Sequence, residues 1–163
     1  MAKQKEIKTN AMRILDKEKI VYKTNTYACE EFIDGVHIAD MLGQDYACSF
    51  KTLVTTGKTG EHYVFVLPVD KEVDFKKAAK AVGEKSIEMV HVKDIQNLTG
   101  YIRGGCTPIG MKKHFKTVVH ASALEFDEII ISGGRLGLQL ILSPKDLQKV
   151  TDAAFEDIIM QSI

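Results

Sequence analysis

The spacing of apolar residues predicts an amphipathic helix near the start of the chain. Ile7, Ala11, Ile14 and Leu15 occupy the i, i+4, i+7 and i+8 positions of one helix face, while most charged residues fall between them. We therefore expect a helix from Lys3 to about Lys19 whose apolar face packs on a sheet. No stretch reaches the roughly 18 apolar residues that a membrane-spanning helix needs, so we expect no contact with a membrane.

Capping residues mark three further helices. Asp34 is placed to cap a helix over Gly35–Leu42, and Gly83 stops a helix that runs through Phe75–Val82. The dipeptide Ser143-Pro144 takes the N-cap and N1 positions of the last helix. The apolar face of that helix is expected to comprise Leu147, Val150, Ala154 and Ile158.

Runs rich in β-branched and aromatic residues predict the strands. Thr56–Gly60 has the composition of a hairpin turn and joins two of these runs, the second of which ends at Pro68. The expected strands cover residues 21–27, 49–56, 62–67, 87–90, 117–120, 128–132 and 138–142. Hairpins mixed with irregular helices favour an α+β fold with a mixed or largely antiparallel sheet and helices outside it. We expect one domain over residues 1–163, a length that suffices for one core.

The charge balance and the cysteines narrow the class of protein. Lys and Arg total 22, as do Asp and Glu, so no global positive field attracts nucleic acid and any RNA contact must be local or shared. The cysteines Cys29, Cys48 and Cys106 form no C-x-x-C pair, which argues against disulfides and zinc and fits a reducing cytoplasm. The histidines have no metal-ligand spacing. We therefore expect no metal, no cofactor and no signal peptide.

Two glycine-rich turns are the strongest functional signal. They are Gly104-Gly105-Cys106-Thr107-Pro108-Ile109-Gly110 and Ser132-Gly133-Gly134-Arg135-Leu136-Gly137. Because glycine has no Cβ, it accepts positive φ and lets backbone N–H groups approach a ligand closely. The second turn lies between two strand-like runs, which provide a rigid base. Each turn is therefore expected to form one wall of a ligand site.

Lys51 is the leading candidate for chemistry. Strand alternation places Lys51 on the same face as Leu53, while Thr52 points to the other face. The lysine stem would then follow apolar surface and present its ammonium at the rim of a cleft, where it can bind phosphate or stabilise an oxyanion. The alternative is a strand-edge lysine that discourages aggregation.

The other candidates have structural alternatives. Tyr27 offers an aromatic plate for a base or fills a core, and the hydroxyls of Thr52 and Ser132 can bind a ligand or form turns. Loop amides could make Cys106 a thiolate nucleophile, but a buried structural cysteine is the better interpretation. The basic run Lys112–Lys116 can follow an RNA backbone or lie on a solvated surface. The chain has no G-x-S-x-G nucleophile elbow and no Gly-Lys-Ser/Thr phosphate loop.

Three ordered motifs resemble the YbaK/EbsC family of bacterial Cys-tRNA(Pro) deacylases. They are Phe50-Lys51-Thr52-Leu53, the first glycine turn with Met111-Lys112-Lys113, and the second glycine turn with Leu138. The resemblance runs through nearly the whole chain, including Asn25-Thr26-Tyr27 and the segment from Phe75 to Gly83. It implies the fold of the editing domain of bacterial prolyl-tRNA synthetases, a mixed sheet that closes toward a barrel and is flanked by helices.

This resemblance implies a trans-editing hydrolase that cleaves the ester between cysteine and the 3′ end of tRNA(Pro). The implied partners are cysteine-carrying tRNA(Pro) and prolyl-tRNA synthetase. In the substrate-assisted mechanism of the family, the cysteine thiol attacks its own carbonyl and gives a thiolactone, so the protein supplies no covalent nucleophile. An activated ester then needs only positioning and stabilisation of charge on its oxygen.

The resemblance also implies the roles of individual residues. Lys51 corresponds to the essential lysine of the family and Tyr27 to its substrate-site tyrosine. The glycine turns would cradle the terminal adenosine and the aminoacyl group. Gln139 replaces an aspartate found in relatives, and Phe50 replaces a tyrosine. The expected substrate contacts are Tyr27, Thr52, Gly104, Gly105, Pro108, Gly110, Ser132, Gly133, Gly134, Gly137 and Gln139.

Two other functions stay open from the sequence. The first is a non-catalytic module that binds nucleotides or RNA ends. The second is an editing deacylase for alanine or serine, which would need a water-activating group that the motifs do not show. The sequence does not indicate the oligomeric state.

Overall fold

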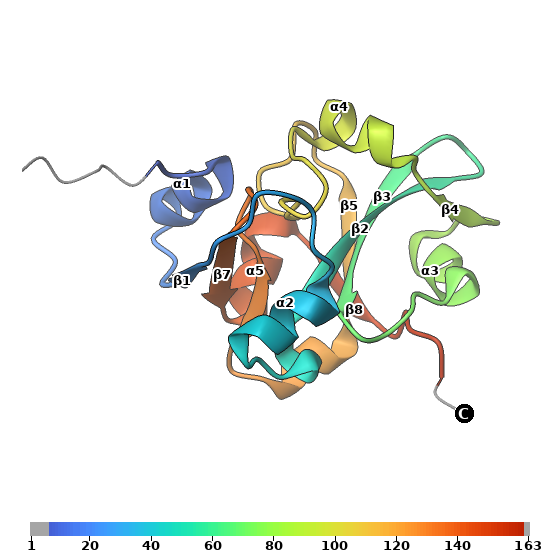
Figure 1. Cartoon of the computed structure of the whole chain (residues 1–163). Coiled ribbons are helices and arrows are strands. Elements are labelled where there is room, and N and C mark those ends of the chain that lie inside the picture. Colours follow the sequence, from blue (N-terminus) through green and yellow to red (C-terminus); the bar gives the residue numbers. More distant parts are fainter. Residues whose placement is uncertain (1–6, 162–163) are drawn as a thin grey trace, which may run out of the picture.

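Two open sheets with helices around them form the fold in the computed structural model, which describes residues 7–161 (Figure 1). The strands are β1 (Lys23–Thr26), β2 (Phe50–Gly57), β3 (His62–Pro68), β4 (Ile87–Met89), β5 (Lys116–His120), β6 (Ile129–Ser132), β7 (Leu138–Leu142) and β8 (Ala154–Glu156). The helices are α1 (Asn10–Lys17), α2 (Gly35–Leu42), α3 (Phe75–Val82), α4 (Ile95–Thr99) and α5 (Pro144–Thr151), with short 3-10 turns η1 (Tyr46–Cys48), η2 (Val92–Asp94) and η3 (Ala121–Glu125). None of the helices in this range is long and apolar enough to cross a membrane.

The two sheets differ in size and in strand direction. The smaller sheet is antiparallel with the order β1-β7-β6, and the larger sheet is mixed with the order β4-β2-β3-β5-β8. In the larger sheet, β4, β2 and β3 pair antiparallel, while β3, β5 and β8 pair parallel. An isolated parallel bridge between Ser49 and Ile130 joins the sheets, and within residues 7–161 they do not close into a barrel. The predicted α+β class with a mixed sheet is confirmed.

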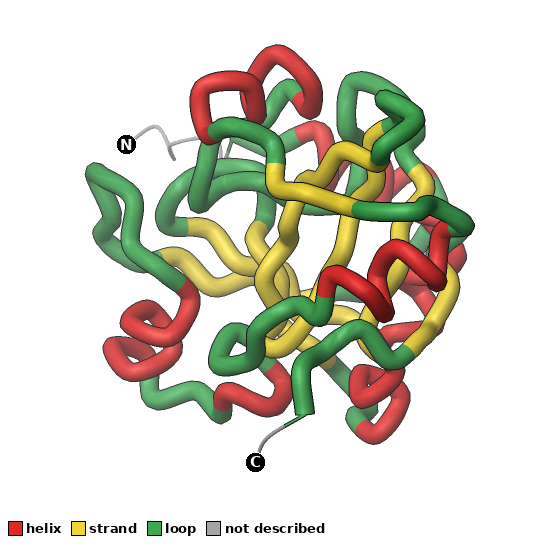
Figure 2. Tube along the Cα trace, turned by 90° about the vertical axis from the view of Figure 1, so that its right-hand side faces the viewer, coloured by secondary structure: helices red, strands yellow, loops and turns green. Residues whose placement is uncertain are grey.

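Strand β3 is buried on both faces, which explains its continuous apolar sequence. Val64 and Val66 belong to a core cluster that also includes residues of the smaller sheet, α1 and α5. Phe65 and Leu67, which point the other way, pack with the buried residues of α3. Strands therefore gather in the middle of the molecule with helices on several sides (Figure 2).

Helix α1 is shorter than its apolar pattern predicted. It begins at Asn10, because the Thr9 side chain accepts a hydrogen bond from the backbone N–H of Met12 and so caps the helix. Residues 7–9 are not helical, and the predicted helical residues 3–6 lie outside the described part of the chain. The apolar face packs on the core as expected, since Ala11 and Leu15 are fully buried.

The prediction for the last helix was wrong at its C-terminal end. Helix α5 starts at Pro144 with Ser143 as its cap, as predicted, but it ends at Thr151. Asp152 has a φ of 55°, a left-handed conformation that stops the helix. Ala154 then lies in β8, which pairs with β5, and Ile158 packs in the α3 cluster. The helical spacing of these two residues was therefore coincidental.

Candidate functional site

A cavity of about 420 Å³ lies at the start of β2, beside α2 and the first glycine turn. Most of its wall is apolar, and a few polar side chains interrupt it, as is usual for small-molecule sites. Its polar and charged lining residues are Tyr27, Asp34, Gln44, Ser49, Lys51, Thr52, Arg103, Ser132 and Gln139. These residues come from segments far apart in the sequence, and the sheets and turns bring them together.

Lys51 presents a partly desolvated cation to this cavity. It lies in β2 opposite Leu67 of β3, and its side chain is half-buried. Burial lowers the pKa of the Lys51 ammonium, and three carboxylates act in the opposite direction, those of Glu72, Asp70 and Asp34. Among the described residues no hydrogen bond or ion pair holds this ammonium. It is therefore available to an oxygen of a substrate.

The two glycine turns pack against each other. The Ser132 hydroxyl donates a hydrogen bond to the Gly104 carbonyl oxygen over 3.3 Å. A Cβ on Gly105 would lie 2.8 Å from the Cα of Arg135, closer than real Cβ contacts allow. The turns thus form one double layer beside the cavity. At Gly105 the missing side chain makes room for protein backbone.

The start of α1 holds both turns from outside the cavity. The Thr9 hydroxyl donates to the Gly133 carbonyl over 2.6 Å, and the Asn10 amide donates to the Gly110 carbonyl over 2.7 Å. A Cβ on Gly134 would lie 3.0 Å from the Cβ of Thr9. These glycines therefore allow a close approach of α1 to the turns.

About half of the predicted site residues line the cavity. Those that do are Tyr27, Lys51, Thr52, Gly104, Ser132 and Gln139. Those that do not are Gly105, Pro108, Gly110, Gly133, Gly134 and Gly137. Gly137 lies next to the site, because its carbonyl accepts a hydrogen bond from the backbone N–H of Tyr27 over 2.9 Å. Direct contact of the second group with a substrate stays a prediction.

Gln139 forms a reciprocal amide pair with Gln44 in the cavity wall. The Gln44 amide nitrogen donates to the Gln139 oxygen over 2.7 Å, and the Gln139 nitrogen donates back to Gln44 over 3.1 Å. Asn25 donates a third, longer hydrogen bond to the Gln139 oxygen over 3.4 Å. The position where the sequence lacks a carboxylate is therefore a satisfied, neutral pair of amides.

Cys106 lines the cavity but is not built as a nucleophile. It is buried, and burial raises the pKa of its thiol to about 11. No histidine is among the described residues that line the cavity. A cysteine or serine there consequently lacks the neighbouring imidazole that would activate it.

Sequence comparison decides the family. The model of the aminoacyl-tRNA editing domain matches residues 36–150. The chain belongs to this family. A relative from Enterococcus faecalis, named as the Cys-tRNA(Pro)/Cys-tRNA(Cys) deacylase EbsC, is 44% identical over 160 residues, which cover 97% of this chain and 98% of the relative. The resemblance to the YbaK/EbsC family is therefore confirmed.

More distant comparisons agree on the editing-domain fold. The Escherichia coli K12 protein named multifunctional Ser/Thr-tRNA deacylase ProXp-y is 24% identical over 117 residues, covering 69% of this chain and 70% of that protein. The crystal structure of hypothetical protein APE2540 matches with a TM-score of 0.85 and 22% identity, over 93% of this chain and all of that one. A structure described as a trans-editing enzyme for prolyl-tRNA synthetase matches with a TM-score of 0.79 and 22% identity. The match covers 96% of this chain and 100% of that one.

The sequence interpretation missed several residues at the cavity of this editing domain. Asp34 was recognised only as a helix cap, and Phe32, Gln44 and Arg103 were not considered. Arg103 carried a usable signal, because it directly precedes the first glycine turn. Phe32 and Gln44 flank α2 and belong to no motif, so the fold alone brings them to the site.

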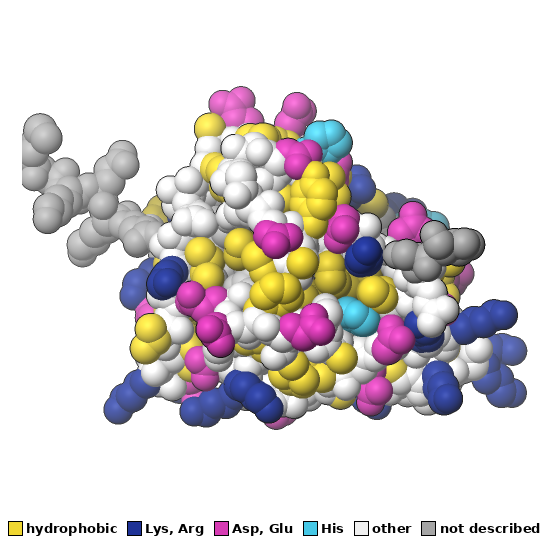
Figure 3. All heavy atoms as spheres, turned by 90° about the horizontal axis from the view of Figure 1, so that it is seen from below, with side chains coloured by type: hydrophobic (Ala, Val, Ile, Leu, Met, Phe, Trp, Pro, Cys, Tyr) yellow, Lys and Arg dark blue, Asp and Glu magenta, His cyan; other side chains and the backbone are white. Residues whose placement is uncertain are grey.

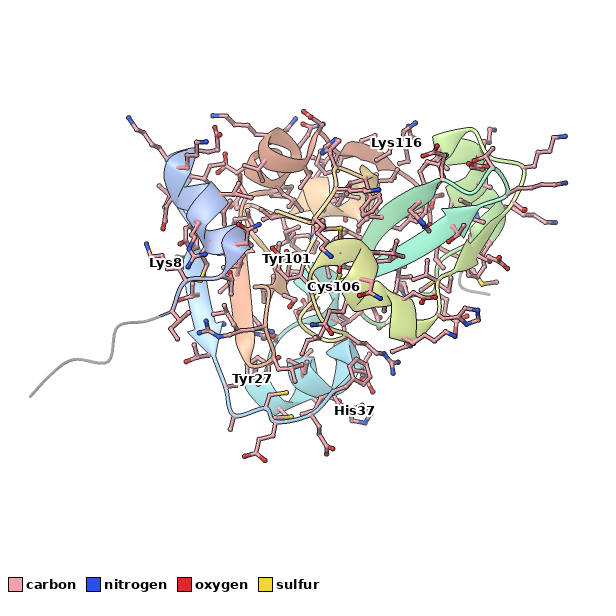
Figure 4. All side chains as sticks on the ribbon, turned by 90° about the horizontal axis from the view of Figure 1, so that it is seen from above. Lys8, Tyr27, His37, Tyr101, Cys106 and Lys116 are labelled. Atoms are coloured by element: carbon pink, nitrogen blue, oxygen red, sulfur yellow. The ribbon has the colours of Figure 1, made fainter. Side chains whose placement is uncertain are left out.

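The basic run Lys112–Lys116 lies away from the cavity of the editing domain. Lys113 and Phe115 line a separate hollow of about 200 Å³ beside α1 and α5. Figure 4 shows Lys116 at the edge of the molecule opposite Tyr27, which lines the cavity. This run therefore cannot contact the same part of a ligand as Lys51.

The amide pair of the editing domain gives a stability prediction. Replacing either Gln44 or Gln139 by leucine leaves the other amide without its partner, and we expect each change to lower the free energy of unfolding by about 1–3 kcal/mol. The double variant should lose less than the sum of the two, because both partners are then removed. Urea unfolding measures all three variants. Strictly additive losses would show that the pair is not coupled.

Proposed function

We propose that this protein is a trans-editing deacylase that hydrolyses the ester of cysteine with tRNA(Pro). The observation that carries the proposal is the Lys51 ammonium in a mostly apolar cavity whose described lining contains no nucleophile paired with a base. The name of the relative that is 44% identical along almost the whole chain supports this substrate class. Residues 1–163 would then form one editing domain.

A substrate-assisted reaction suits this site. The substrate thiol sulfur attacks its own carbonyl carbon, a C–S bond forms, and the bond to the ribose oxygen breaks. The thiol proton ends on that ribose oxygen, which leaves as the free 3′ end of the tRNA, and the cysteine leaves as a thiolactone. Water then adds to the thiolactone carbonyl and the C–S bond breaks, which gives free cysteine with its thiol restored. Lys51 stabilises the negative charge that develops on the carbonyl oxygen. The apolar wall excludes water and strengthens this interaction.

Deacylation of serine or alanine is a less suitable function for this cavity. Neither amino acid carries a thiol, so a protein group would have to activate water. The one carboxylate in the described lining belongs to Asp34, which accepts from the backbone N–H of His37 over 2.9 Å and meets its imidazole over 2.7 Å. Asp34 is therefore occupied as a helix cap, which favours cysteine over both alternatives.

Prolyl-tRNA synthetase is the proposed partner that presents the tRNA. The net charge is zero, and no Lys or Arg occurs between Lys23 and Lys51, the segment that supplies much of the cavity. On the face seen in Figure 3, most Lys and Arg side chains lie at the margins, and apolar and acidic side chains share the middle. Affinity for tRNA alone should therefore be modest and sensitive to salt. A second tRNA-binding protein would supply the missing affinity.

The amino-acid preference tests the proposal. We expect the purified protein to deacylate Cys-tRNA(Pro) at least tenfold faster than Ser-tRNA(Pro) or Ala-tRNA(Pro), because only cysteine carries the attacking thiol. The measurement is the initial rate of loss of each labelled amino acid, corrected for spontaneous hydrolysis. A faster rate with serine or alanine would replace the cysteine assignment with the other editing activity.

Replacing Cys106 tests whether the protein supplies a nucleophile. Because its thiol has a pKa of about 11, almost none of it is ionised at neutral pH. We expect Cys106→Ser to retain the deacylation rate on Cys-tRNA(Pro) to within about threefold. A loss comparable to that of removing a catalytic nucleophile would contradict the substrate-assisted mechanism.

A further inference from the structure

A stacked pair of side chains lies at the rim of the cavity, outside the chemistry of Lys51. The central guanidinium carbon of Arg103 lies 3.8 Å from the centroid of the Phe32 ring. Phe32 comes from the segment between β1 and α2, and Arg103 precedes the first glycine turn. Both residues line the cavity, yet both are exposed, Phe32 by 42%. They therefore offer a guanidinium plane, backed by an aromatic ring, to a group that enters the cavity.

Gly104 allows the Phe32 ring to lie close to its backbone. A Cβ on Gly104 would lie 3.0 Å from the Cδ2 of Phe32 and 2.8 Å from the Cδ2 of Leu136. The ring thus lies close to bare backbone, and Arg103 covers it. Gly104 also has a φ of 86°, which favours glycine. The contact between the two side chains thus exists in the folded chain itself, so a ligand need not create it.

We infer that the adenine of the terminal nucleotide stacks on the Phe32–Arg103 pair. This inference rests on the proposed function, in which the ester carbonyl lies at Lys51. The ribose that carries the ester belongs to the terminal adenosine, so its base is the next group outward along the substrate. RNA bases stack on aromatic rings and on guanidinium planes. The exposed Phe32–Arg103 pair at the rim of the same cavity would contact the adenine at the point where the substrate emerges from the cavity.

The charges around the rim are of both signs. Glu30 and Glu31, beside Phe32, are exposed acids, and they repel phosphate. Arg103 and Lys51 are the two cations among the described lining residues. With Lys51 at the ester, Arg103 is the cation that attracts the phosphate next to the terminal nucleotide. Arg103 therefore both stacks with the base and attracts the RNA backbone.

A fluorescent base tests the inference directly. The probe is a hairpin RNA that carries no amino acid. It has the tRNA(Pro) acceptor stem and 2-aminopurine in place of the terminal adenine. We expect the wild-type protein to quench its fluorescence, and Phe32→Ala and Arg103→Gln to need roughly fivefold or more protein for half the quenching. Phe75→Ala and Arg13→Gln are the matched controls. Phe75 is 41% exposed, neither residue lines the cavity, and both controls should quench as the wild type does.

Deacylation kinetics separate this inference from the proposed function. Base stacking is present before and during the reaction, so Phe32→Ala should raise KM for Cys-tRNA(Pro) and leave kcat nearly unchanged. Quenching that does not depend on Phe32, in a protein that deacylates Cys-tRNA(Pro), would overturn the stacking inference alone. Phe32-dependent quenching without deacylation would support the stacking and contradict the proposed function. An absence of quenching by the wild type would also overturn the inference.

Discussion

Replacing Lys51 by methionine should lower the deacylation rate of Cys-tRNA(Pro) at least 100-fold and leave the protein folded. Methionine keeps an unbranched stem along the cavity wall and removes the ammonium. Removal of one group that stabilises a developing oxyanion costs about 100- to 1,000-fold in rate. Since burial already lowers the pKa of Lys51, loss of this charge should not lower the free energy of unfolding. Single-turnover deacylation and urea unfolding measure the two effects.

Lys58→Met is the matched control for this experiment. Lys58 follows the same strand, β2, but it lies exposed in the hairpin turn and does not line the cavity. Its loss removes the same charge from the whole protein, so a general electrostatic effect on tRNA binding would slow both variants equally. A folded Lys51→Met protein that keeps the wild-type rate would contradict the catalytic role of Lys51.

Gly137→Ala should be among the most destabilising single substitutions in the chain. Gly137 has a φ of 78°, which costs an L-residue about 1–2 kcal/mol. In addition, a Cβ there would lie 2.5 Å from the backbone oxygen of Tyr27. The backbone at Tyr27 cannot move aside without shifting β1. We therefore expect overpacking to lower the free energy of unfolding by about 1–3 kcal/mol more. Because Tyr27 lines the cavity, deacylation should fall as well.

A Gly83→Ala variant separates the effect of the positive φ from the effect of the close contact with Tyr27. Gly83 ends α3 with a φ of 76°, almost the same as Gly137, but nothing lies within 4 Å of a Cβ built on it. Gly83→Ala should therefore lose only the conformational part of the stability, and its deacylation rate should stay at the wild-type value. Urea unfolding with equal slopes compares the two variants. Equal losses of stability would show that the close approach to Tyr27 does not matter.

Elements with local capping signals were predicted well from the sequence. Helix α2 follows the predicted range, because Asp34 accepts a hydrogen bond at its start and Gly43 adopts a left-handed conformation at its end. The hairpin of β2 and β3 was equally clear from its turn. The end of α5 was not, because an aspartate, Asp152, takes the left-handed position that glycine usually marks. The parallel pairing of β5 with β8 depends on contacts far apart in sequence.

The lining of the cavity could be predicted only partly from the sequence. A glycine signals that something approaches its backbone closely, but it does not say what approaches. At Gly105 and Gly137 the neighbour is the protein's own backbone, whereas Gly104 reaches the cavity. The pairing of Gln44 with Gln139 and of Phe32 with Arg103 joins segments that only the folded chain brings together.

The most direct test of the proposed function is the rate at which the purified protein releases labelled cysteine from Cys-tRNA(Pro), with and without prolyl-tRNA synthetase. The proposal predicts release well above spontaneous hydrolysis, with thiolactone as the first product and an increase when the synthetase presents the tRNA. Release at the spontaneous rate in both mixtures would contradict the assignment as a deacylase of this substrate, and a non-catalytic module that binds RNA ends would then account better for the cavity.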